Sequence, residues 1–375
     1  MKFTISRDGF LKPLQAANSI IEKRSTLPIL SNVLLEVPSD NLRLLKVTAT
    51  DLETQVRVSV PLETDAIAGI VTAPAKKLFD IVRTLGDDIN VTFESKSTNK
   101  ASLSAGRSKF SLATLNAEEF PDFAIESVLF TTSIDMPTLK KGVDATSFCM
   151  AHNDVRYYLN GVLFEFTQSD CLNLVATDGH RLGFYPIQGV VTTSNTEESA
   201  ILPRKSVFEL SKLINSSTED TTITVGHGYI NFAIENLEFT SKLVDGVFPQ
   251  YRKVVPKNNP IEVTANRLEV KNTTQRMSIL ANEKYKGIAL YIQGSTLKAT
   301  SQNPLQEEAE EFIDISCNDD SKEHGICFSA DYFIDALNAL DGKQVFLSFK
   351  DESSGIFITD PEMPDNIYVV MPMKI

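Results

Sequence analysis

The chain has 375 residues and a formal net charge of −13, with 42% hydrophobic and 23% charged residues. This length favours two or three domains, and the composition is ordinary for a soluble globular protein. No apolar run approaches the roughly 20 residues that a membrane-spanning helix needs, which excludes a helical membrane protein.

The first third, residues 1–125, is predicted to fold as one unit of strands and two helices. Apolar periodicity predicts a first helix over about 8–24, with Asp8 as its N-cap. A second helix is predicted near Pro74, because a residue without an N–H is tolerated in the first helical turn. Strands are predicted at 1–5, 32–37, 42–50, 54–62 and 110–115.

Residues 126–255 and 256–375 are predicted to repeat this pattern, which gives an α+β fold of three similar domains. The helix sequence at 73–81 (APAKKLFDI) is echoed at 202–210 (LPRKSVFEL) and 328–336 (FSADYFIDA). Further helices are predicted after Met136 and over 266–281, and a last strand from Tyr368 to the final residue. Three like units are more typical of a scaffold or ring than of an enzyme, because catalysis needs one asymmetric pocket.

Basic residues are frequent on the predicted helices, as at Lys76-Lys77 and Lys140-Lys141, whereas the run at 306–311 is acidic. One interpretation is that these are ordinary solvated helix faces. The other is a basic surface that meets phosphates without reading sequence, despite the negative net charge. Since no zinc finger, helix-turn-helix or aromatic RNA-binding motif is present, sequence-specific readout is not favoured.

The densest polar cluster is 177–182 (TDGHRL). Asp178 and His180 could form an acid–base pair or part of a metal site, but the favoured interpretation is an Asp-Gly turn between two strands. The four histidines have no metal-ligand spacing, and the chain lacks GxSxG, Walker and GxGxxG motifs. We therefore predict no catalytic residue, no metal and no cofactor.

Tyr157 and Tyr158, beside Arg156, indicate either a strand that leads to a turn or an aromatic surface for single-stranded bases or a partner peptide. The C-terminal run at 369–374 is apolar and contains two methionines. It is either a core edge strand or part of an adaptable docking groove, since methionine side chains fit irregular surfaces.

Two segments would suit head-to-tail pairing between copies of the chain. The first, at 107–112, is basic and apolar, and the second combines Ile279 and Leu280 with the acidic run at 307–311. Such a heterologous contact makes a closed ring if its rotation closes. The alternative is that both segments are ordinary surface.

The four cysteines are far apart and include no CxxC pair. They are Cys149, Cys171, Cys317 and Cys327. This pattern indicates reduced thiols rather than disulfides or a zinc site, and the N-terminus lacks the features of a signal peptide. We therefore expect a cytoplasmic protein.

Several stretches together resemble the β sliding clamp family, the processivity subunit of bacterial replicative DNA polymerase III. They are 1–4 (MKFT), 26–30 (TLPIL), 154–161 (DVRYYLNG), 176–182 (ATDGHRL), 239–246 (FTSKLVDG), 306–311 (QEEAEE) and 368–373 (YVVMPM). The resemblance implies a head-to-tail homodimer whose six domains surround duplex DNA, with helices lining the hole. It implies non-specific DNA binding, docking of the polymerase, the clamp loader and other motif-bearing proteins, and no catalysis.

The same resemblance implies three sets of site residues. The partner-peptide pocket matches Leu159, Thr177, Gly179, His180, Arg181, Leu182, Pro249, Lys253, Val254, Val369, Met371, Pro372 and Met373. The DNA contacts match Arg24, Asn153, Tyr157, Tyr158 and Lys205. The dimer interface matches Arg107, Lys109, Phe110 and Leu112 against Ile279, Leu280, Glu307, Glu308, Glu310 and Glu311. Lys253 and Asn153 depart from the arginine and glutamine that are common in the family, which is expected to alter those two contacts in detail.

Overall fold

The structure is a computed structural model of the chain. It describes residues 1–21, 27–97, 99–121, 123, 127–192, 197–214, 219–255, 259–319 and 321–373. The chain divides into two compact units. Unit 1 contains Met1–Pro137, Val191–Ser194 and Phe208–Leu243, and unit 2 contains Thr138–Val190, Asn195–Val207 and Val244–Ile375.

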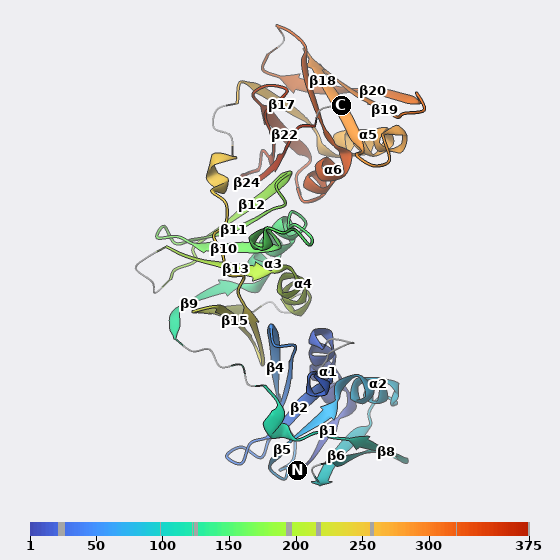
Figure 1. The fold of residues 1–375 in the computed structure, drawn as a ribbon, viewed down its shortest axis with the longest axis vertical. Coiled ribbons are helices and arrows are strands. Elements are labelled where there is room, and N and C mark those ends of the chain that lie inside the picture. The colour runs from blue at the N-terminus through green and yellow to red at the C-terminus, as the bar shows by residue number, and fades with distance from the viewer. Residues whose placement is uncertain are drawn as a thin grey trace. The chain divides into compact units, whose positions relative to one another are not determined.

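Unit 1 contains two antiparallel sheets (Figure 1). The larger has the order β5 (Gly69–Pro74), β2 (Asn32–Val37), β3 (Leu44–Thr50), β4 (Thr54–Pro61), β16 (Leu237–Lys242), β15 (Tyr229–Ile234), β14 (Asp220–Gly226), β9 (Val128–Asp135). The smaller has the order β1 (Lys2–Ser6), β6 (Asn90–Ser97), β7 (Lys100–Ala105), β8 (Ser108–Ala113). Strand β8 is therefore the outer strand of the smaller sheet.

Helices α1 (Arg7–Ile20) and α2 (Ala75–Thr84) pack on each other and on these sheets. The prediction that Asp8 caps the first helix is wrong, because the Ser6 hydroxyl accepts a hydrogen bond from Gly9 N at 3.1 Å. Phe10 packs into the core against Phe3, with 5.6 Å between the ring centroids. The predicted end of this helix, at residue 24, lies outside the described residues.

Unit 2 is built on one long antiparallel sheet (Figure 1). Its order is β13 (Glu198–Pro203), β10 (Gly161–Phe166), β11 (Cys171–Thr177), β12 (Arg181–Gln188), β24 (Met363–Val370), β23 (Ile356–Asp360), β22 (Gln344–Phe349), β17 (Ile261–Asn266), β20 (Glu308–Cys317), β19 (Thr296–Gln302), β18 (Gly287–Gln293), β21 (His324–Ser329). Helices α5 (Arg267–Leu280) and α6 (Ala330–Asn338) pack on each other in this unit. Helices α3 (Met136–Ser147) and α4 (Arg204–Leu213) each have residues in both units.

The predicted α+β class is confirmed, with six helices and antiparallel sheets in the part of the chain that is described. The last strand was predicted to reach the final residue, and this is wrong: β24 ends at Val370. Beyond Val370 the backbone makes the separate hydrogen bonds described below, and Pro372 has no N–H group to donate to a neighbouring strand. The proposed limits at 125 and 255 remain predictions.

Candidate functional site

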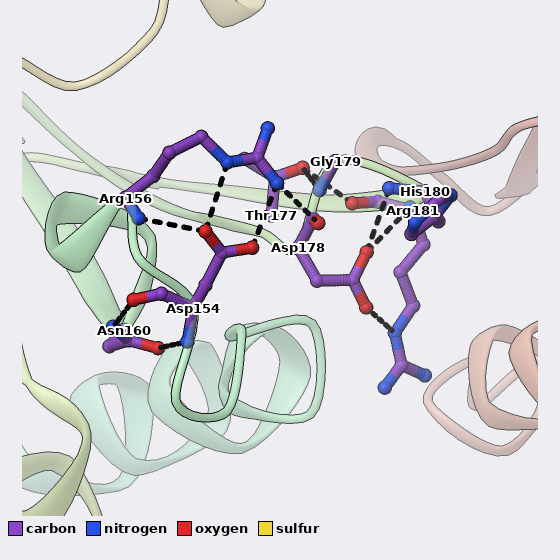
Figure 2. Close-up of polar contacts among 8 residues, drawn as sticks. All are labelled: Asp154, Arg156, Asn160, Thr177, Asp178, Gly179, His180 and Arg181. Carbon is purple, nitrogen blue, oxygen red and sulfur yellow. Dashed lines mark hydrogen bonds and ion pairs between the residues drawn. The ribbon is translucent and has the colours of Figure 1, made fainter.

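The polar cluster at 177–181 is a turn that connects β11 to β12 (Figure 2). Asp178 Oδ1 accepts hydrogen bonds from the backbone N–H groups of His180 (2.9 Å) and Arg181 (3.0 Å). Thr177 Oγ1 donates to Arg181 O (2.6 Å) and accepts from Gly179 N (3.1 Å). Gly179 has a φ of +90°, which strains any residue with a side chain. The geometry favours the turn over the acid–base interpretation, because Asp178 holds the backbone together.

A second loop, at 154–160, lies beside this turn (Figure 2). Arg156 donates to Asp154 through Nε (3.0 Å) and Nη2 (2.8 Å), which lowers the pKa of that carboxyl to about 2. Arg156 Nη2 also lies 3.5 Å from Asp178 O, so this side chain spans the two loops. Asn160 closes its own loop by exchanging hydrogen bonds with the Asp154 backbone.

The C-terminal segment lies beside the same turn. Strand β24 pairs with β12, with Val370 opposite Arg181. Beyond the strand, Met371 N donates to His180 O (2.8 Å) and Met373 N donates to Cys327 O (2.7 Å). The segment 371–373, which we call the strap, thus connects the turn to β21. Met371 is exposed, and Met373 is half-buried.

An apolar cluster lies below the turn and the strap. Leu182 and Val369 are buried in it with Phe248 and Tyr251. These side chains are covered by the protein, so the cluster supports the turn and the strap and exposes little surface of its own. Val254, which follows Tyr251 in the sequence, is 46% exposed.

The linker at 251–253 is held on the sheet by the Glu165 carboxylate. Tyr251 Oη donates to Glu165 Oε2 (2.6 Å), and Asn173 Nδ2 donates to the same oxygen (2.8 Å). Arg252 makes a bidentate ion pair with Glu165: Nη1 donates to Oε1 (2.9 Å) and Nη2 donates to Oε2 (2.7 Å). Burial and the adjacent carboxylate raise the pKa of the Tyr251 hydroxyl. This arrangement fixes where Lys253 and Val254 lie.

A cavity of about 1550 Å³ opens on the other side of the strap. Of the predicted pocket residues, it is lined by His180, Met371, Pro372 and Met373. Leu159, Leu182 and Val369 are instead buried in the protein, so they support the site from below. The sequence interpretation missed Tyr332 and Cys327 in this lining, because both belong to segments far from the turn in the sequence.

Four of the five predicted DNA-contacting residues belong to the part of the chain that the structure describes. Arg24 lies outside the described residues. Asn153, with a φ of +57°, and Tyr157 are exposed on the 153–160 loop, and Tyr158 is half-buried there. Lys205 is exposed in the first turn of α4, and Arg204 N, next to it, donates to Asn160 O (2.9 Å). That hydrogen bond ties the helix start to the loop.

The first predicted interface segment is largely β8. This strand pairs with β7 alone among the described strands, so its other edge is open. Arg107 and Lys109 are exposed and Phe110 is half-buried. Leu112 is only 6% exposed. Its side chain therefore packs inside unit 1 and is poorly placed for a contact with another chain.

The second predicted interface segment joins the end of α5 to β20. Residues 308–314 of β20 pair with β19 alone among the described residues, which leaves a second open edge. Ile279 is 76% exposed, and Phe312, which the sequence interpretation missed, is 59% exposed. Leu280 is half-buried. The four glutamates already have partners: Glu307 accepts from Asn303, Glu308 from Gln302, Glu310 pairs with Lys298, and Glu311 with Arg276.

Among the described residues, no group of three or more histidine, cysteine, aspartate or glutamate side chains is arranged to hold a metal ion. The helices of this part of the chain also include none that is long and apolar enough to span a membrane.

Comparison with known proteins gives full-length matches. Models of the DNA polymerase III beta subunit match in order: its N-terminal domain at residues 1–124, its central domain at 133–250 and its C-terminal domain at 252–374. The beta sliding clamps of Pseudomonas aeruginosa and Escherichia coli K12 are 39% and 41% identical to this chain, with all of both chains covered.

Solved structures give the same result. The sliding clamp of Pseudomonas aeruginosa bound to griselimycin has a TM-score of 0.95 and 39% identity to this chain. The pol III beta of Caulobacter crescentus has a TM-score of 0.93 and 30% identity. Both comparisons cover all of each chain.

Proposed function

The chain belongs to the DNA polymerase III beta subunit family, the beta sliding clamps, and we propose that it works as a homodimeric ring around duplex DNA. The observation that carries the proposal is the match of all three family domains, in order, along the whole chain. A clamp of this family gives a DNA polymerase processivity by keeping it attached to DNA.

The two open sheet edges support the ring. Lys109 lies on β8 and Arg107 directly precedes this strand at one edge, and the open part of β20 carries glutamates at the other. An edge strand pairs readily with another chain, and opposite charges select the head-to-tail orientation. Each subunit then contributes one edge of each kind, so the contact is heterologous, and we propose that its rotation closes after two subunits. Phe110, Ile279 and Phe312 supply its apolar part.

The groove between the turn, the strap and the 251–254 linker is proposed to bind short peptide segments of partner proteins. Methionine side chains adapt to different ligands, and buried apolar anchors dominate the energy of such contacts. A Pseudomonas aeruginosa relative was solved with griselimycin, a peptide ligand, and we propose that the same compound binds this chain. The natural partners are proposed to be the polymerase catalytic subunit, the clamp loader and other proteins with a docking motif.

Duplex DNA is proposed to be held by enclosure and by weak phosphate contacts. Arg24, Asn153, Tyr157, Tyr158 and Lys205 are the proposed contact residues. Contacts to phosphate carry no sequence information, which allows sliding. The net charge of −13 limits non-specific adhesion of DNA elsewhere on the protein.

We further propose that the chain catalyses no reaction and acts in the cytoplasm. The Asp178 carboxylate, which would be the catalytic base of the alternative hypothesis, holds the turn through two backbone N–H groups and pairs with Arg181 (3.1 Å). A carboxylate that is held by these hydrogen bonds and this ion pair is a poor catalytic base, because it would have to lose those partners to accept a proton.

The ring is tested by retention on DNA. The clamp, loaded by a clamp loader and ATP onto nicked circular DNA, is expected to co-elute with the DNA in gel filtration. Cutting the circle should release the clamp, because it can slide off a free end. A protein that stays on the linear product would be bound by surface contacts, and the enclosing ring would be excluded.

The groove is tested by Met373→Ala. We expect griselimycin affinity, measured by calorimetry, to fall roughly 5- to 30-fold, which is the effect of losing one apolar anchor worth about 1–2 kcal/mol. The dimer should remain intact, since the substitution leaves the charged and apolar side chains of both proposed interface edges unchanged. Met363→Ala, at the start of β24, is the matched control and should bind normally. Equal affinity in both variants would remove the strap from the binding site.

A further inference from the structure

We propose that Asp335 on α6 is a positioning residue of the peptide groove, which acts through Arg181 and does not touch the peptide. This inference rests on the function proposed above for the groove. Asp335 is not part of the pocket that the sequence predicted, and among the described residues it lies outside the lining of the cavity beside the strap.

Arg181 is a nearly buried cation with two carboxylate partners. Its side chain is 14% exposed. Nε pairs with Asp178 at 3.1 Å, and Nη1 pairs with Asp335 at 2.6 Å. A guanidinium that has lost most of its water needs such partners on both sides of its fork, because an unpaired buried charge is strongly destabilising.

Two aromatic rings complete the surroundings of this guanidinium. Its central carbon lies 4.5 Å from the ring centroid of Tyr332 and 5.5 Å from that of Phe148. Both distances are in the range of a cation–π contact. Tyr332 and Asp335 are three residues apart on α6 and so lie on one face of the helix. A single helix face therefore supplies both an ion pair and a ring contact to Arg181.

The backbone around Arg181 forms the turn and holds the strap. Arg181 N and O are hydrogen-bonded within the turn, to Asp178 and Thr177. The preceding residue, His180, accepts the hydrogen bond from Met371 N that holds the strap. A displacement of the Arg181 side chain would thus be passed to His180 in the turn and, through its hydrogen bond, to Met371 in the strap.

The cavity contacts of α6 support the same role. Tyr332 lines the cavity together with His180, and their rings are stacked with 6.4 Å between centroids and 18° between planes. Asp335 anchors the same helix face from outside the cavity. Its carboxylate thereby sets the position of the turn and the strap, whereas Tyr332 is in direct reach of a ligand.

The experiment uses the full-length protein and griselimycin as the probe, with affinity measured by calorimetry. Asp335→Asn is expected to bind about tenfold more weakly, since it removes one charge from a coupled network at almost constant shape. Asp335→Glu keeps the charge and should recover most of the affinity. Asp341→Asn is the matched control, because Asp341 follows α6 in the sequence, pairs with Lys141 (2.8 Å) and is not among the residues that line the cavity. It should bind like the wild type.

A double-mutant cycle separates positioning from direct contact. In an Arg181→Met background, the Asp335→Asn substitution should have no further effect on griselimycin affinity. A persistent loss there would mean that Asp335 acts without Arg181, and wild-type affinity of the Asp335→Asn single variant would also overturn the proposal. If the wild-type protein fails to bind griselimycin, the groove assignment itself is wrong. The thermal unfolding temperature of each variant is expected to fall below that of the wild type, since Arg181 loses a partner, but a single cooperative transition well above the assay temperature shows that the fold is kept.

Discussion

The Ile279→Lys variant is expected to be a monomer at concentrations where the wild-type chain is a dimer. Ile279 is 76% exposed at the end of α5. Helix α5 lies against β20, since Thr273 Oγ1 donates to Glu311 Oε1 at 2.7 Å. An ammonium forced into the apolar part of this contact without a partner costs about 2–5 kcal/mol. That corresponds to a contact roughly 30-fold to several thousand-fold weaker at each of the two interfaces of the ring.

The measurement is absolute mass by light scattering across a dilution series. The wild type should give twice the 41.5 kDa of the chain, and the variant should give the mass of one chain. Leu268→Lys is the matched control, because Leu268 is exposed on the same helix, about 16 Å away along its axis. It should remain a dimer. A dimeric Ile279→Lys variant would exclude this end of α5 from the interface.

The Glu165→Ala variant is expected to lose about 2–4 kcal/mol of unfolding free energy. The substitution leaves the Tyr251 hydroxyl and the Asn173 amide, both buried or nearly so, without their acceptor. The Arg252 pair contributes less, because its side chain is 58% exposed and solvent screens the interaction. Urea denaturation followed by circular dichroism measures the loss.

The same variant should weaken griselimycin binding, because Tyr251 and Arg252 hold the 251–254 linker, whose residues Lys253 and Val254 belong to the proposed groove. Glu262→Ala is the control. Glu262 is an exposed carboxylate on β17 in the same unit, and its removal should change stability by less than about 0.5 kcal/mol. If Glu165→Ala proves as stable as Glu262→Ala, the Glu165 contacts do not hold the linker.

Local patterns predicted most of the secondary structure well. Strand β2 has the predicted limits of Asn32 and Val37, and α5 spans Arg267–Leu280 within the predicted 266–281. Such limits are encoded within a few residues, by alternation of apolar side chains and by caps such as Asn266, which accepts from Glu269 N. The error at Asp8 is a shift of two residues, since the cap is Ser6, whose hydroxyl accepts the hydrogen bond from Gly9 N.

The site depended on contacts between distant segments. The turn at 177–181 was recognisable from its Asp-Gly pair, and the family resemblance supplied the predicted pocket residues, of which His180, Met371, Pro372 and Met373 line the cavity beside the strap. The roles of Glu165 and Asp335 had no local signal, because Glu165 meets Tyr251 and Arg181 meets Asp335 only after the sheet has formed. The burial of Leu112, which weakens its assignment to the interface, also followed from packing alone.

The sequence by itself therefore determined the repeat, the class of fold, most helix and strand limits and the family, since these depend on short-range periodicity and on linear motifs. The tertiary structure alone decided that β24 lies beside β12, that the strap meets His180, and that α6 reaches Arg181. The reason is physical: pairing of remote strands is selected by burial over the whole unit, and no short segment contains that information.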